Sequence, residues 1–209
     1  MPAHVTLSSA FADWETPSWF VDLVHEVGPI VLDPATSARN PTRALTGYLP
    51  PAHPFDTSLC GLTGPWPGEG LVFVNPRYGA FLRGPVSPRR PVFKDGVLVG
   101  FGTGWVRRIC QHQGEGLVLV PARPDTEWWR ELHAWADWVL LWASSTRGSR
   151  VHFIDPRIGK VAHGSNMPSS VFYRGPRVQR FCEVFEPHGT LVPGRDTLER
   201  LLRLHCEQP

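Results

Sequence analysis

The residues best suited to chemistry are Asn75, Pro76 and Tyr78, which follow a run of four apolar residues. An exocyclic amine on a nucleobase is a poor nucleophile, because its nitrogen lone pair is delocalised into the ring. The side-chain oxygen of Asn75 and the backbone oxygen of Pro76 can accept the two amine hydrogens and stabilise the positive charge that builds on the nitrogen. Tyr78 adds a flat face on which an extruded base can stack. This pattern suits methylation of a planar amine without a metal or a strong general base.

Taken alone, an Asn-Pro pair is also an ordinary strand end followed by a turn, so its interpretation depends on two other segments. Thr16 and Pro17 are typical of a helix start, and the exposed N–H groups of a helix N-terminus bind carboxylates. Asp33 follows the apolar run 30–32, where it can meet an amino group or a ribose. No glycine-rich turn follows Asp33, so the dinucleotide-binding fingerprint is absent.

Short apolar runs alternate with helical stretches, which predicts one α/β domain over residues 1–209. We expect three layers: a mostly parallel sheet, helices on both faces and an antiparallel strand pair near the C terminus. The expected strands are 30–32, 71–74, 117–120, 138–142, 151–154 and 170–173, the last two forming the pair, and the expected helices are 16–27, 105–112, 125–138 and 196–206. Ligands bind at the carboxyl ends of parallel strands, and Asn75 stands at such an end.

Two segments fall outside this alternation. Residues 36–69 are rich in Pro, Gly and Thr and are predicted to be mostly loop, unless a helix lies within 36–47. Residues 80–103 form a basic insertion with a predicted hairpin around Asp95 and Gly96. Its candidate nucleic-acid contacts are Arg83, Arg89, Arg90 and Lys94. Such a hairpin can follow phosphates or enter a groove, close over the site as a lid, or be a solvated surface loop.

Composition limits the classes of protein to which the chain can belong. Its 209 residues and 42% apolar content suit one domain with a full hydrophobic core. The chain has no run of eighteen apolar residues and no secretory leader pattern, which predicts a cytoplasmic protein without a membrane span. The four cysteines are far apart, which favours reduced thiols and no metal site. A net charge of +2 neither requires nor excludes nucleic acid.

These segments occur in a set order that gives a family resemblance. The chain has Trp14-Glu15-Thr16-Pro17, Leu32-Asp33-Pro34-Ala35, Gly61-Leu62 with Trp66, Asn75-Pro76-Arg77-Tyr78, and later Leu119 to Trp129, Gly148 to Phe153 and Pro168 to Ser170. Over about residues 13–175 this order resembles the phage DNA N6-adenine methyltransferase family, which uses S-adenosylmethionine. The ordered set is fairly specific, although no single segment is.

The resemblance implies a Rossmann-like class I methyltransferase fold, S-adenosylmethionine as cofactor and double-stranded DNA as substrate, with the target adenine flipped out of the duplex. It implies that Asn75, Pro76 and Tyr78 are catalytic. The cofactor-binding residues it implies are Trp14, Thr16, Pro17, Asp33, Pro34 and Ala35. It also implies a phage- or prophage-encoded protein acting in the cytoplasm of a bacterial host. We expect a monomer or a weak dimer.

Two departures from the family pattern leave alternatives open. Arg77 stands where the family usually has a second Pro, which makes the loop less rigid; Arg77 is a candidate contact to nucleic acid, or it spoils the pocket. One alternative is therefore a catalytically degenerate protein of this fold that binds DNA without turnover. Another is a methyltransferase for an RNA base or a protein glutamine, whose acceptor is also a planar nitrogen. The second departure is the long basic insertion 80–103.

Two further groups of residues complete the sequence interpretation. Arg123 and Asp125 match positions of the family, and we expect them to serve folding. Trp14, Trp66 and Trp105 are candidates for base stacking, whereas the tryptophans between positions 128 and 142 are expected in the core. Residues 176–209 are expected to form a strand and a packing helix.

Overall fold

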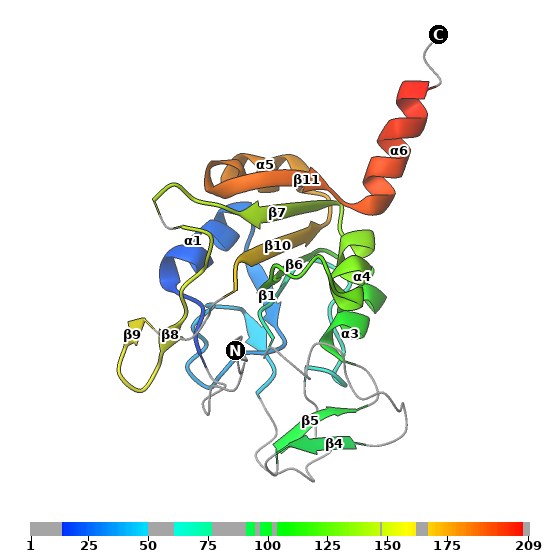
Figure 1. The fold of residues 1–209 in the computed structure, drawn as a ribbon. Coiled ribbons are helices and arrows are strands. Elements are labelled where there is room, and N and C mark those ends of the chain that lie inside the picture. Colours follow the sequence, from blue (N-terminus) through cyan, green and yellow to red (C-terminus); the bar gives the residue numbers. More distant parts are fainter. Residues whose placement is uncertain are drawn as a thin grey trace, which may run out of the picture.

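The computed structural model describes residues 14–49, 61–76, 91–94, 97–101, 104–146, 148–161 and 167–206, with only the backbone described for 91–94 and 97–101. Within these residues, the fold is built on a seven-stranded sheet in the order β11–β7–β10–β6–β3–β1–β2 (Figure 1). Its strands are β1 (Ile30–Asp33), β2 (Thr46–Gly47), β3 (Leu71–Val74), β6 (Gly116–Pro121), β7 (Trp138–Trp142), β10 (Ser169–Arg174) and β11 (Gly189–Pro193).

Most strands of this sheet run in one direction. Strands β2, β1, β3 and β6 pair in parallel. Strand β10 pairs antiparallel with both β6 and β7, so β7 runs the same way as β6, and β11 runs antiparallel to β7 at the edge. Two hairpins complete the strands: β4 (Pro91–Lys94) with β5 (Val97–Phe101), and β8 (Ile154–Asp155) with β9 (Lys160–Val161).

Helices cover both faces because the central strands are apolar on both sides, as expected of buried parallel strands. On β3, Leu71 and Phe73 pack in one hydrophobic cluster, while Val72 and Val74 pack in the other. The first cluster includes α1 (Ser18–Val27) and α5 (Val178–Phe185), and the second includes α3 (Trp105–Gln111) and α4 (Glu127–Trp135). A short 3-10 turn (Glu186–His188) precedes β11, and α6 (Arg195–Cys206) follows it.

The α/β class and the mostly parallel sheet that the sequence predicts are confirmed. The predicted hairpin around Asp95 and Gly96 is also present, with Lys94 opposite Val97. Residues 36–47 contain no helix; instead Thr46–Gly47 forms β2 beside β1. The helix α5 was not predicted, although its Phe181, Val184 and Phe185 carry a helical apolar face.

The predicted pairing of 151–154 with 170–173 is wrong. Strand β10 is buried along nearly all its length and lies between β6 and β7, where both of its edges are hydrogen-bonded. Ile154 instead pairs with β9 and with Glu15. Alternating apolar residues identify a strand but leave its partner open, which explains the error. The antiparallel strands near the C terminus are therefore β10 and β11, each with other partners.

No helix in the described part of the chain combines the length and the apolar character needed to cross a membrane.

Candidate functional site

The carboxyl edge of the parallel strands gathers the segments that the sequence singled out. Strand β1 ends at Asp33, β3 ends directly before Asn75, and β6 ends at Pro121. Because β1, β3 and β6 are neighbours and parallel, these ends lie at one edge of the sheet. This is the edge at which open α/β sheets bind ligands.

A hydrogen bond joins two of the predicted site residues from distant parts of the sequence. The amide Nδ2 of Asn75 donates to the hydroxyl Oγ1 of Thr16 at 2.9 Å. Thr16 is buried and Asn75 is half-buried. The Thr16 hydroxyl does not cap α1, which begins at Ser18 after Pro17 and receives no side-chain cap. The sequence therefore located the helix start, whereas the structure gives the hydroxyl a different partner.

The segment that carries Thr16 is held by the β8 strand. Glu15 and Ile154 exchange two backbone hydrogen bonds, each of 2.9 Å. The Glu15 carboxylate also forms a 3.0 Å ion pair with Arg39, whose Nη1 donates to the carbonyl of Pro156. These contacts of Glu15 fix the segment next to Thr16, whose hydroxyl accepts the amide of Asn75.

Asp33 holds the turn that follows β1. Its Oδ1 accepts the N–H of Ala35 at 2.9 Å, and its Oδ2 accepts the hydroxyl of Thr42 at 2.7 Å. Burial raises the pKa of the Asp33 carboxyl to about 6, and these hydrogen bonds oppose the rise. The side chain expected to meet a cofactor is therefore bonded within its own loop, and it shapes the backbone of Pro34 and Ala35.

The Gly61 segment packs directly on this turn. A Cβ at position 61 would overlap the carbonyl of Pro34, so only glycine fits this approach. The indole Nε1 of Trp66 donates to the carbonyl of Gly61 at 2.8 Å. The guanidinium of Arg108 lies 4.8 Å from the Trp66 ring centre. Trp66 therefore supports the turn rather than presenting an open ring to a base.

The other two tryptophans that were candidates for base stacking also pack against the core. Trp105 is buried in the cluster under α3 and α4, although it was a candidate for base stacking. Trp14 is half-buried and packs against the other cluster. The tryptophans predicted to lie in the core do so: Trp128, Trp129, Trp135 and Trp142 are buried, and Trp138 packs against a core cluster.

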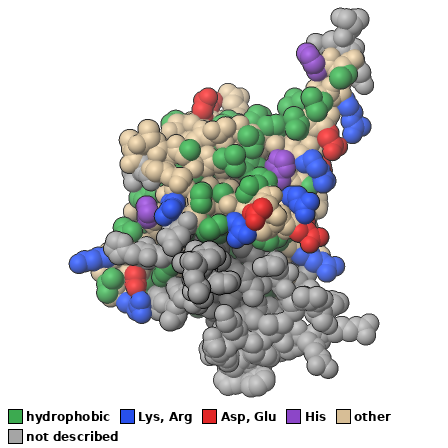
Figure 2. Space-filling model, in the orientation of Figure 1, with side chains coloured by type: hydrophobic (Ala, Val, Ile, Leu, Met, Phe, Trp, Pro, Cys, Tyr) green, Lys and Arg blue, Asp and Glu red, His purple; other side chains and the backbone are tan. Residues whose placement is uncertain are grey.

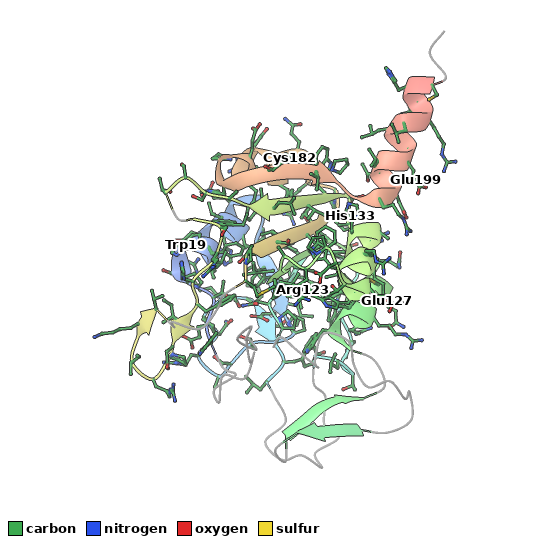
Figure 3. All side chains as sticks on the ribbon, in the orientation of Figure 1. Trp19, Arg123, Glu127, His133, Cys182 and Glu199 are labelled. Carbon is green, nitrogen blue, oxygen red and sulfur yellow. The ribbon has the colours of Figure 1, made fainter. Side chains whose placement is uncertain are left out.

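An open hollow of about 520 Å³ lies beside the Thr16 segment. Its lining consists of Pro17, Ser18, Trp19, Thr146, Arg150, His152, Ile154 and Val161. Figure 3 labels Trp19 on the first turn of α1, where the hollow begins. Its volume is within the range of small-molecule sites, roughly 300–1,000 Å³. The first turn of α1 and Arg150 contribute positive character to it.

Several predicted residues lie outside the described residues. Arg77, Tyr78, Arg83, Arg89 and Arg90 belong to this group. Lys94 ends β4, for which only the backbone is described. Their predicted roles stay predictions.

Arg123 and Asp125 form an ion pair just before α4, which begins at Glu127 (Figure 3). The Nε and Nη2 atoms of Arg123 each donate to a carboxylate oxygen of Asp125 at 2.9 Å. The Arg123 guanidinium holds the pKa of the Asp125 carboxyl below its usual range. Thr126 donates its hydroxyl to the carbonyl of Arg123 at 2.7 Å. These contacts fit the folding role expected for both residues.

Sequence reasoning missed a polar cluster at the opposite edge of the sheet. The carboxylate of Glu115, before β6, accepts the Tyr173 hydroxyl at 2.6 Å and the Arg177 Nε at 2.9 Å, and a second Arg177 nitrogen donates to its other oxygen. These partners are 58 and 62 residues away along the chain. No local pattern marks such a pairing, so the sequence offered no signal for it.

Within the described residues, no group of three or more His, Cys, Asp and Glu side chains could hold a metal ion. Comparisons with protein-family models, with curated proteins and with solved structures gave no match to this chain.

Proposed function

We propose that the chain is an S-adenosylmethionine-dependent methyltransferase that modifies N6 of adenine in double-stranded DNA. The observation that carries the proposal is the hydrogen bond between Asn75 and Thr16 at the carboxyl edge of the parallel strands. It joins two motifs that the family resemblance pairs in one site. The Asp33 turn follows the neighbouring strand β1 at the same edge.

The Asn75 contact supports a specific role for its amide. Because Nδ2 donates to Thr16, the carbonyl oxygen Oδ1 is turned to the other side of the amide group. In the proposed reaction, Oδ1 and the backbone oxygen of Pro76 accept the two hydrogens of the target amine. The interaction strengthens as positive charge develops on the nitrogen, which is the condition for lowering the barrier.

The hollow beside α1 fits the amino-acid end of the proposed cofactor. Arg150 and the amide N–H groups at the start of α1 suit a carboxylate. Pro17 belongs both to this lining and to the predicted cofactor residues. When bound, S-adenosylmethionine supplies an electrophilic methyl group. The Asp33 carboxyl keeps the turn through Pro34 and Ala35 in shape, and in this proposal that turn binds another part of the cofactor.

The proposed DNA contacts rest on the sequence. Arg77, Arg83, Arg89, Arg90 and Lys94 would bind phosphates near the site, and Tyr78 would stack on the flipped adenine. In this proposal the protein acts in the cytoplasm of a bacterial host, on phage or host DNA.

The proposal is tested with purified protein and S-adenosylmethionine labelled in its methyl group. Separate reactions receive unmethylated double-stranded DNA, single-stranded RNA and a glutamine-containing peptide. We expect label in the DNA alone, recovered as N6-methyladenine after digestion to nucleosides and mass spectrometry. Label in the RNA or the peptide alone would reassign the acceptor, and calorimetric cofactor binding without any transfer would indicate a degenerate methyltransferase. Failure to bind the cofactor would overturn the proposal.

A further inference from the structure

The β8–β9 hairpin closes in a tight turn that extends from the body of the molecule, below α1 in the view of Figure 1. The backbone oxygen of Asp155 accepts the N–H groups of Ile158 and Gly159, at 3.3 and 2.8 Å. Gly159 has a φ of +64°, a conformation that glycine adopts readily. Ile158 therefore lies in the turn, 63% exposed, with Arg157 before it and Lys160 shortly after it.

Contacts of Glu15 connect this hairpin with the candidate site. The backbone of Glu15 pairs with β8, and Arg39 joins the Glu15 carboxylate to the carbonyl of Pro156 in the hairpin. The next residue, Thr16, accepts the amide of Asn75. A substrate as wide as a DNA duplex cannot be held by the site alone, so its backbone must also rest on surfaces beside the site. The hairpin is such a surface.

Two ion pairs of this surface expose the cation and bury the carboxylate. The side chain of Arg39 is 57% exposed, whereas that of its partner Glu15 is 17% exposed. Arg157 is 59% exposed, whereas its partner Asp155 is 11% exposed. Other pairs in the described part of the chain expose both members about equally: Arg43 with Asp22, Arg180 with Glu26, and Arg195 with Asp196. Each hairpin pair is neutral in total, but the side that meets the solvent is positive.

The exposed Lys160 adds a third cation to this surface, opposite Asp155 in the register of the two strands. Figure 2 shows Lys and Arg side chains at this end of the molecule, with hydrophobic side chains next to them. A positive surface of this kind is complementary to a polyanion, and the regular phosphates of a nucleic acid are the polyanion that the neighbouring site would require.

We infer that the β8–β9 hairpin binds the sugar–phosphate backbone of a nucleic-acid duplex. Arg39, Arg157 and Lys160 contact phosphates, and Ile158 lies against the groove between them. The inference rests on the proposed function for the identity of the duplex, which is the DNA whose adenine reaches Asn75. Phosphate contacts position a duplex without reading its sequence, so the hairpin sets where the DNA lies and not which sequence is chosen.

The buried carboxylates prepare the arginines for this contact. Asp155 accepts hydrogen bonds from Nε and Nη2 of Arg157, at 3.0 and 2.6 Å. A side chain that is already held in place loses less conformational freedom when a ligand binds. The planar guanidinium is also the cation best matched to phosphate oxygens. The ion pair therefore orients Arg157 at the surface and does not withdraw it from a phosphate.

An anionic membrane surface would also attract cations beside an apolar tip. Elements that bind membranes insert the whole apolar face of an amphipathic helix or an acyl chain. The exposed large apolar side chains described on this hairpin are Ile158 and Val161, and Val161 lines the hollow beside α1. Ile158 alone offers too little apolar surface to hold the protein in a bilayer, so the observations favour the duplex.

Fluorescence anisotropy of the full chain with a labelled, unmethylated DNA duplex tests the inference over a salt series. Lys160→Gln should raise the Kd roughly fivefold at physiological salt and lower the slope of log Kd against log salt by about 0.9, as expected for one lost phosphate contact. Arg203→Gln is the matched control. It removes the same charge from a 76% exposed side chain on α6, far from the hairpin, and should bind like the wild type (Figure 1).

Ile158→Ser tests the apolar part of the contact. It should raise the Kd about threefold and leave the salt slope unchanged, because an apolar contact releases no counterions. Since positions 158 and 160 are both exposed, the variants should fold like the wild type, and circular dichroism verifies this. An unchanged Kd for Ile158→Ser would remove that side chain from the interface. Equal effects of Lys160→Gln and Arg203→Gln, or no duplex binding by the wild type, would overturn the inference.

Methyl transfer to the same duplex separates this inference from the proposed function. If the wild type transfers methyl groups while Lys160→Gln binds DNA as tightly as Arg203→Gln, the inference is wrong and the proposed function stands. If the duplex binds through the hairpin but receives no methyl group, the inference stands and the proposed function is wrong. Binding to phosphatidylserine vesicles that is lost in Ile158→Ser, without duplex binding, would assign the hairpin to a membrane and overturn the inference.

Discussion

The two edges of the central sheet hold polar groups of different kinds. At the amino edge, the charge of the buried Glu115 carboxylate is neutralised by Arg177, and the Tyr173 hydroxyl donates a hydrogen bond to it. At the carboxyl edge, the link between Thr16 and Asn75 joins a hydroxyl to an amide, with no charge on either group. Removing one member of a buried ion pair leaves a costly unpaired charge, whereas removing an uncharged partner costs much less.

We expect this difference in charge to separate the residues that set stability from the residues that set activity. The amino edge ties together β6, β10 and the start of α5, so we expect substitutions there to change the free energy of unfolding. At the carboxyl edge, the proposed reaction uses the amide of Asn75, so we expect substitutions of Asn75 and Thr16 to change the rate of methyl transfer, whereas Asp33 at the same edge serves stability. The predictions below test this separation.

The largest effect is expected for Asn75→Ala. It removes the oxygen that would accept an amine hydrogen, and we expect kcat for methyl transfer to fall by roughly a thousandfold. The free energy of unfolding should change by about 1 kcal/mol or less, because the lost hydrogen bond is between uncharged groups. Radiolabel transfer measures the first quantity, and calorimetry should show cofactor binding near the wild-type level. Full activity in this variant would remove Asn75 from the proposed reaction.

The next largest effect is expected for Glu115→Gln. The variant leaves the guanidinium of Arg177, whose side chain is 34% exposed, without its buried counter-charge, and we expect unfolding to cost roughly 2–3 kcal/mol less, below the cost for a fully buried pair. Urea unfolding measures this change. Glu183→Gln is the control, because its pairing with Arg180 is exposed and should contribute at most about 0.5 kcal/mol. Similar losses in both variants would contradict a special role for the amino edge.

The raised pKa of Asp33 predicts that the free energy of unfolding depends on pH. Burial raises the pKa of its carboxyl from 3.8 in the unfolded chain to about 6 in the folded protein. Between these two pH values the folded protein therefore holds a proton that the unfolded chain has lost. Stability from this group is therefore present at about pH 4 and falls as pH rises towards 6, by about 2–3 kcal/mol. Urea unfolding at pH 4.5, 5.5 and 7 should show this slope in the wild type and a flatter one in Asp33→Asn. Equal slopes would show that Asp33 does not titrate in this range.

The smallest effect is expected at Thr16, whose hydroxyl accepts a hydrogen bond from the amide of Asn75. Thr16→Val removes the hydroxyl at nearly constant volume, and we expect kcat to fall about tenfold through loss of one orienting hydrogen bond. The KM for DNA should stay within about twofold of the wild type, and a rise in the KM for the cofactor would show that Thr16 also contacts it. Thr16→Ser keeps the hydroxyl and should recover most of kcat. If serine and valine behave alike, the hydroxyl does not orient the amide.

Much of the fold could be predicted from local patterns. The apolar runs at 71–74 and 117–120 identify β3 and β6, and the Asp-Gly pair identifies the β4–β5 hairpin. These features depend on residues within a few positions of each other. The place of β10 between β6 and β7 depends on which strand buries its edges best in three dimensions, and no residue of 169–174 encodes that choice alone.

The contacts within the candidate site could not be predicted from local sequence patterns either. The order of motifs suggested that Thr16 and Asn75 belong to one site, yet their direct hydrogen bond spans 59 residues. Asp33 was expected to face a cofactor, but its carboxylate oxygens bind Ala35 and Thr42. A sequence shows that an Asp follows a strand, whereas the acceptors and donors around it are set by how the next loop folds back.

The most direct test of this account measures methyl transfer and unfolding free energy together on Asn75→Ala and Glu115→Gln, at a temperature where both are folded. We predict a crossover: Asn75→Ala keeps its stability and forms N6-methyladenine roughly a thousandfold more slowly, while Glu115→Gln loses stability and keeps kcat near the wild-type value. Loss of transfer in folded Glu115→Gln to the level of Asn75→Ala, or transfer by Asn75→Ala at the wild-type rate, would contradict the division between the two edges.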